Sequence, residues 1–191
     1  LGALPFDVNQ CHADFVVADG HKWMLGPEGI ALLYVAEPQL ERLQLHQFGW
    51  HMVRERGNYD IKTWNIASDA KRFECGSPNM LGIHGLNASL GLLEEIGGER
   101  IQAELMTRVG ALEQQLRDHP QLELITVTDR PLRSGILTFR HRTMATPALF
   151  KHLRDQQVVC APRGGGIRFS PHFYTPLDVL ERAVNLIPGK E

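Results

Sequence analysis

The sequence lacks the features that mark several large classes of protein. It has only three cysteines among 191 residues, and their odd number and wide spacing fit a reducing compartment better than a disulfide framework. No apolar run approaches the roughly 20 residues that cross a bilayer. The formal charge of −2 offers no basic surplus for a nucleic acid or an anionic membrane surface. We therefore expect an ordinary soluble protein in the cytoplasm, with neither kind of partner.

The start of the chain is also missing the usual signals. Leu-Gly-Ala-Leu-Pro is neither an initiator methionine nor a secretory signal, and residues 1–35 look like the interior of an α/β domain. We expect a fragment, a processed product or the ordered part of a longer protein. None of the nine histidines stands with acids or cysteines at metal-ligand spacing, so we expect no metal site.

Apolar patterning predicts alternating strands and helices. Continuous apolar runs at residues 13–19 and 30–35 predict two buried strands around a glycine-rich loop, followed by a short helix and a long irregular region over 47–75. Helical spacing over 83–96 and 101–116 predicts two amphipathic helices, the first capped by Ser77. Further strands are expected at 122–127, 135–140, 158–161 and 167–170, and further helices at 146–156 and from Thr175, which we expect to cap the last one.

Lys22 is the first candidate for chemistry. It follows a predicted strand, stands beside His21 and precedes a glycine-rich turn, which places it near a sheet edge where ligands bind α/β domains. Spacing alone leaves two interpretations open. Lys22 is either a solvated loop lysine or a nucleophilic amine that forms a Schiff base with a carbonyl.

Three ordered segments resemble motifs of the class V aminotransferase-like enzymes, the pyridoxal-phosphate group of fold type I that includes cysteine desulfurases, isopenicillin-N epimerase-like proteins and kynureninases. The segments are Asp19-Gly20-His21-Lys22-Trp23 with Gly26-Pro27-Glu28-Gly29 after it, Arg72-Phe73-Glu74-Cys75-Gly76-Ser77-Pro78-Asn79, and Ile167-Arg168-Phe169-Ser170-Pro171-His172-Phe173-Tyr174. The resemblance spans nearly the whole chain.

The resemblance implies a role for four residues. Lys22 would hold pyridoxal phosphate as a Schiff base and act as general base toward the α-proton of an amino acid. His21 would contact the cofactor phosphate, and Ser77 would reach the phosphate of a neighbouring subunit, which implies a homodimer with shared active sites. Arg168 would pair with the substrate α-carboxylate, a task that suits a planar bidentate donor.

Two departures from the family pattern qualify this reading. Asp19 stands where many members place a phosphate-binding serine, so it either points elsewhere or this branch holds phosphate differently. The family residues that bind the pyridine ring come before the lysine segment, and the chain does not contain them.

Cys160 lies on a predicted buried strand close to Arg168, which argues against the mobile nucleophile of a typical desulfurase.

By this resemblance we expect the fold class α/β. Residues 1–97 would be the C-terminal part of a fold-type I large domain, with a mainly parallel sheet, and the connecting helix, and residues 98–191 would be a small α+β domain. The expected function is that of a pyridoxal-phosphate enzyme acting on an amino acid, a transferase of the aminotransferase type. This expectation concerns the parent protein, and the isolated chain need not be active. Two alternatives stay open, a cysteine desulfurase or C–S lyase and a non-catalytic dimerisation or interaction fragment. The substrate and the reaction subtype are left open.

Overall fold

The chain forms two compact units in this computed structural model, which describes residues 1–129 and 133–189. The units are Leu1–Ile96 and Gly97–Glu191. No helix in the described part of the chain has the length and apolar character that a membrane span requires.

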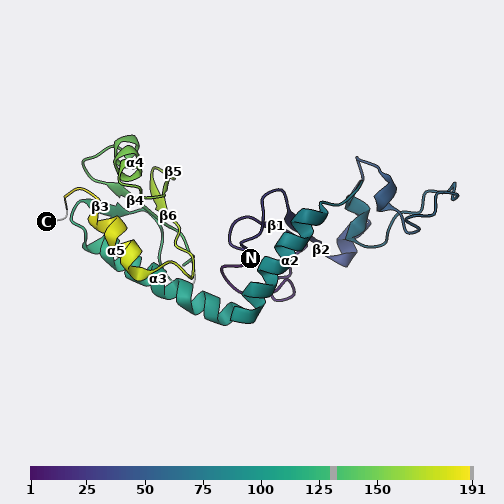
Figure 1. Cartoon of the computed structure of the whole chain (residues 1–191), viewed down its shortest axis with the longest axis horizontal. Coiled ribbons are helices and arrows are strands. Elements are labelled where there is room, and N and C mark those ends of the chain that lie inside the picture. The colour runs from purple at the N-terminus through teal and green to yellow at the C-terminus, as the bar shows by residue number, and fades with distance from the viewer. Residues whose placement is uncertain (130–132, 190–191) are drawn as a thin grey trace. The chain divides into compact units, whose positions relative to one another are not determined.

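The first unit is built around a hairpin and one long helix (Figure 1). The two strands are antiparallel, with Phe15 opposite Val35 and Asp19 opposite Ala31. The loop between them, residues 20–30, carries Lys22. The elements are β1 (Phe15–Asp19), β2 (Ala31–Val35), α1 (Glu37–Leu40), the short 3-10 helices η1 (Trp50–Met52) and η2 (Ala70–Phe73), and α2 (Met80–Ile96).

The strands β1 and β2 were predicted to be buried on both faces, and that prediction is wrong for this chain. Phe15, Val17 and Leu33 are 49%, 73% and 48% exposed, and Val35 alone among the strand residues is buried. A two-stranded sheet can bury its apolar side chains only against other elements, and the described residues do not cover both of its faces. Every strand pair in the described residues is antiparallel, so the parallel part of a fold-type I sheet does not lie among them.

Helix α2 begins two residues later than predicted, and its cap is Asn79 rather than Ser77. The Asn79 side-chain oxygen accepts a hydrogen bond from the Gly82 N–H at 2.9 Å, which satisfies one of the free donors of the first turn. The Asn79 amide also donates to the Gly29 carbonyl oxygen at 3.1 Å. Asparagine and serine are equally good caps, and this second bond, to a residue far away in sequence, selects the asparagine.

The second unit packs helices on a four-stranded antiparallel sheet of order β3-β4-β6-β5 (Figure 1). Helix α3 lies against α5 and against β3 and β4, and α4 packs on β4, β5 and β6. The elements are α3 (Gly98–Asp118), β3 (Leu122–Leu124), β4 (Leu137–His141), α4 (Thr146–Asp155), β5 (Ala161–Arg163), β6 (Gly166–Phe169) and α5 (Leu177–Asn185). The core consists of fully buried apolar side chains, among them Leu105, Val109, Leu112, Leu116, Leu137, Phe139, Leu149, Leu153, Ile167 and Val184.

Most of the predicted elements of this unit are confirmed, and two local predictions are wrong. Residues 158–160 are not a strand, because the Val158 N–H donates to the Leu153 carbonyl at the end of α4 and Gln157 turns the chain with a φ of +63°. Thr175 does not cap the last helix. Its hydroxyl instead accepts from the His172 N–H at 2.9 Å, and α5 has no side-chain cap.

Candidate active site

The loop that carries Lys22 is closed by backbone hydrogen bonds at its base. The Gly20 N–H donates to the Ile30 carbonyl at 3.0 Å, and the Gly26 N–H donates to the Gly20 carbonyl at 2.8 Å. A Cβ at Gly20 would lie 2.8 Å from the Ile30 oxygen, closer than real side chains approach, so this base needs glycine. The loop is thereby tied to the first residue after β1 and the last before β2.

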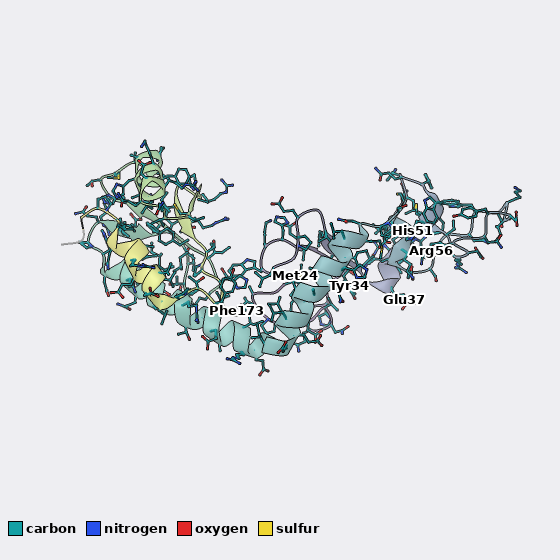
Figure 2. All side chains as sticks on the ribbon, viewed as in Figure 1. Met24, Tyr34, Glu37, His51, Arg56 and Phe173 are labelled. Atoms are coloured by element: carbon teal, nitrogen blue, oxygen red, sulfur yellow. The ribbon has the colours of Figure 1, made fainter. Side chains whose placement is uncertain are left out.

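Lys22 and His21 lie on the solvent side of this loop. Both residues are exposed, and the Lys22 side chain keeps 63% of its surface accessible. Met24, two residues on, is only 2% exposed and anchors the loop to the unit (Figure 2). The Leu25 N–H donates to the Lys22 carbonyl at 3.2 Å, which adds a turn directly behind the lysine. The chain therefore presents a primary amine on an anchored backbone.

Asp19, the departure from the family pattern, points at Lys22. Its carboxylate accepts a hydrogen bond from the Lys22 ammonium, and this bond together with the lysine charge lowers the pKa of Asp19 below its ordinary value of 3.8. Of the two possibilities left open for Asp19, the structure shows the first. The carboxylate serves as a counter-ion to the candidate catalytic lysine.

Ser77 lies apart from the lysine loop, on the approach to α2. It is exposed and lines a hollow of about 650 Å³ together with residues of β2 and α2, and Lys22 is not among the lining residues. Because Asn79 caps the helix, the cap does not engage the Ser77 hydroxyl. Within one chain the structure does not bring Ser77 and Lys22 to a common hollow.

Arg168 belongs to the second unit, on the inner strand β6, where it stands opposite Thr138 and Ala161. Its side chain is half-buried, and its Nε is buried without a hydrogen-bond partner among the described residues. Unsatisfied buried donors are uncommon in proteins, because an unmade hydrogen bond is unfavourable. The guanidinium therefore retains one donor that no described residue satisfies.

Cys160 precedes β5 and is half-buried rather than fully buried as predicted. Burial raises the pKa of its thiol, and the positive charge of Arg154 opposes that rise only in part. A raised pKa lowers the population of thiolate, the nucleophilic form. The environment of Cys160 therefore does not activate it. Among the described residues no three histidine, cysteine, aspartate or glutamate side chains gather as a metal site would require.

Sequence reasoning missed two residues that shape this region, Asn79 and His51. Asn79 is a good cap type and directly follows Pro78, a signal that was visible in the sequence. His51 is 8% exposed and contacts Arg56, Glu74 and the backbone of Cys75. No local pattern marks a histidine for such a setting, since Glu74 and Cys75 are distant from it in the sequence.

The residues present fit pyridoxal phosphate in the chemistry of their donors. An accessible primary amine at Lys22 suits its aldehyde, and the free hydroxyl of Ser77 beside the start of a long helix suits its phosphate. The chain thus has candidate donors for the two ends of this cofactor.

Comparison with known proteins agrees with this reading. The family model Aminotransferase class-V matches residues 1–168, so the chain belongs to the class V aminotransferase family. An uncharacterized aminotransferase of Bacillus subtilis (strain 168), YcbU, is 30% identical over 190 residues, which are 99% of this chain and 49% of that protein. A probable cysteine desulfurase of Halalkalibacterium halodurans is 32% identical over 91% of this chain and 39% of its own length.

Solved structures confirm the predicted fold class. The apo structure of a cysteine desulfurase from Thermococcus onnurineus NA1 superposes with a TM-score of 0.85 at 24% identity, over 97% of this chain and 48% of the other. The chain thus spans about half the length of the curated relatives and structures that it matches.

Proposed function

We propose that the protein containing this chain is a pyridoxal-phosphate enzyme that acts on an amino acid through Lys22. One observation carries the proposal. Lys22 presents an accessible amine from a loop closed at its base, in a segment that resembles the family's cofactor-lysine motif and lies within the residues that the family model matches. A lysine on a backbone of this kind can be held in one position relative to a bound substrate, which is what efficient proton transfer requires.

Each site residue then has a definite task. Lys22 Nζ would hold the cofactor, and the same amine would move the proton at the substrate Cα. His21, exposed beside it, would contact the cofactor phosphate, and the exposed Ser77 would provide a hydroxyl for a phosphate. The guanidinium of Arg168 would bind the substrate α-carboxylate. When bound, pyridoxal phosphate supplies the electron sink for the reaction.

Two features support a homodimer with shared sites. Ser77 lines a hollow that does not include Lys22, as expected if it serves the phosphate held by the other subunit. The first unit also exposes many large apolar side chains, and surfaces of that kind mark contacts with other protein. They include Phe6, Phe15, Val17, Leu33, Phe48, Trp50, Tyr59, Trp64 and Leu81. The rest of a fold-type I large domain and a second subunit together would cover them.

We further propose a cytoplasmic location, supported by three cysteines that are all free thiols.

A cysteine desulfurase or C–S lyase is the second candidate function. It is favoured by the 32% identity to the probable cysteine desulfurase of Halalkalibacterium halodurans. The raised pKa of Cys160 weighs against that thiol as its nucleophile.

The visible absorption of the full-length gene product loaded with pyridoxal phosphate tests the proposal. Lysine-bound cofactor absorbs in the visible, and we expect Lys22→Ala to abolish the band. Lys71→Ala is the matched control, because Lys71 is also an exposed lysine that pairs with an aspartate, Asp69. A normal band in Lys22→Ala would overturn the proposal. Loss of the band in both variants would show that the loss is not specific to Lys22, and the result would not support a Schiff base at that residue.

A further inference from the structure

Helix α2 packs directly against the loop that carries Lys22. Gly85 lies inside this helix, and a Cβ at that position would stand 3.0 Å from Pro27 Cγ and 3.1 Å from Pro27 Cδ. One residue earlier in the loop, a Cβ at Gly26 would stand 2.8 Å from Cδ1 of Leu86, a side chain that is 4% exposed. The loop and the helix therefore meet at glycines, whose lack of a side chain allows this close approach.

The glycine at position 85 is unfavourable for the helix itself. Apart from proline, glycine is the residue that a helix interior tolerates least. At Gly91, also in α2, nothing lies within 4 Å of the Cβ position, so alanine would fit there without a contact. Gly85 instead faces the ring of Pro27, which is closed onto the backbone and has no flexible end that could move aside. Room for the loop is thus a reason for glycine that applies to Gly85 and not to Gly91.

The turn that precedes Pro27 contains a strained residue. Leu25 has a φ of +57°, in the left-handed region that residues with a side chain rarely adopt. Such a conformation persists only where the surrounding structure enforces it. The Leu25 N–H donates to the Lys22 carbonyl at 3.2 Å, and the adjacent Gly26 N–H donates to the Gly20 carbonyl at 2.8 Å. The strained residue is therefore part of the turn that fixes the backbone of Lys22, one residue away from Pro27.

We propose that Gly85 is a positioning residue for Lys22. Because Gly85 leaves room for the Pro27 ring, the loop packs on α2, and this contact keeps Leu25 in its left-handed conformation behind the lysine. A methyl group at position 85 would displace Pro27 by a few tenths of an ångström. The turn would then relax and carry the Lys22 amine away from the cofactor aldehyde. This inference rests on the proposed function, because it concerns the reaction of that amine with the cofactor.

The test compares two ligands of the full-length gene product, pyridoxal phosphate and pyridoxine phosphate, which lacks the aldehyde and cannot become attached to Lys22. Gly85→Ala should bind pyridoxal phosphate about tenfold more weakly, since small displacements of a reacting group have large effects. It should bind pyridoxine phosphate as the wild type does, a result that general loosening of the fold would not give. Gly91→Ala makes the same exchange in the same helix, and this control should bind both ligands as the wild type does.

A second substitution tests whether Pro27 transmits the effect. Pro27→Ala removes Cγ and Cδ, the two atoms closest to a methyl group at position 85. Gly85→Ala combined with Pro27→Ala should therefore bind pyridoxal phosphate no more weakly than Pro27→Ala alone. The inference is overturned if Gly85→Ala binds pyridoxal phosphate normally, if it weakens both ligands equally, or if its loss persists in the double variant.

Variants of Leu25 decide the question if Gly85→Ala does not fold. Glycine adopts the left-handed conformation freely, whereas β-branched valine adopts it least readily. Leu25→Gly should therefore keep cofactor attached to Lys22, and Leu25→Val should lose attachment while still binding pyridoxine phosphate. Equal attachment in these two variants would overturn the inference. If the wild type attaches no pyridoxal phosphate at Lys22, the proposed function itself fails, which is a different result from all of these.

Discussion

The carboxylate of Asp19 and the ammonium of Lys22 form an ion pair across the turn that follows β1. The lysine lowers the pKa of Asp19, so the unfolded chain binds a proton more readily at this carboxylate than the folded chain does. The pair therefore contributes its full stabilisation above the ordinary value of 3.8 and loses it as the pH falls through the lowered pKa. Both side chains are well exposed, so the contribution is small.

The first prediction concerns this titration. In Lys22→Ala the pKa of Asp19 should rise toward 3.8, because both causes of the shift, the hydrogen bond and the charge, are removed. Carboxyl-carbon NMR titration of wild type and variant measures it directly. Lys62→Ala, which removes a lysine that makes no contact with Asp19, serves as the control. An unchanged midpoint in Lys22→Ala would show that the pair does not form in solution.

A second prediction separates stability from binding at the start of α2. Asn79→Ala should lower the free energy of unfolding by about 1–2 kcal/mol, because the Gly82 N–H loses its cap and the Gly29 carbonyl loses a donor. Ser77→Ala should leave stability within about 0.5 kcal/mol, since Ser77 does not cap the helix, while weakening binding of pyridoxal phosphate. Denaturant titration of the two variants decides. If Ser77→Ala lowered the free energy of unfolding as much as Asn79→Ala does, Ser77 would contribute to the cap and the assignment to Asn79 would be contradicted.

The third prediction concerns the reactivity of Cys160. Burial raises the pKa of its thiol, so iodoacetamide should modify it more slowly than the exposed Cys11 near neutral pH. The difference should narrow as the pH rises, because more of Cys160 becomes thiolate. Mass spectrometry of digests over a pH series gives both rates. Faster modification of Cys160, or loss of sulfide release in Cys160→Ser, would reinstate it as the nucleophile of a desulfurase.

A fourth prediction assigns the carboxylate contact. Arg168→Gln should weaken binding of amino acids to the cofactor-loaded protein by about ten- to hundred-fold, the effect of losing hydrogen bonds to a charged group. Primary amines without a carboxylate should bind as before. Arg163→Gln is the matched control, because Arg163 is an exposed arginine on the neighbouring strand β5 whose Nη1 donates to the backbone of Pro162. Equal weakening for amino acids and simple amines would remove Arg168 from the carboxylate site.

The sequence predicted best where local pattern and tertiary packing agree. Helix α3 has Leu105, Val109 and Leu112 at helical spacing, and each is fully buried against the rest of its own unit. The apolar run of β1 has an equally clear pattern, yet Val17 is 73% exposed. An apolar pattern indicates which face of a strand or helix is apolar. It does not indicate whether the element that packs on that face belongs to the same stretch of chain.

The candidate site divides in the same way. The position of Lys22 follows from its motif, and the loop geometry supports it. The partner of Lys22, Asp19, was visible only as a departure from the family pattern, because its direction depends on the geometry of the turn. The burial of His51 was not visible in the sequence, since its contacts with Glu74 and Cys75 join residues more than 20 positions apart.

Attachment of the cofactor at Lys22 is the central claim, and chemical trapping tests it most directly. Borohydride reduction of the loaded full-length gene product converts lysine-bound pyridoxal phosphate into a stable secondary amine, which peptide mass spectrometry then locates. The chain has five lysines, Lys22, Lys62, Lys71, Lys151 and Lys190. We predict that the added mass lies on Lys22. Added mass on one of the other four lysines with Lys22 unmodified, or no trapped cofactor, would contradict the account.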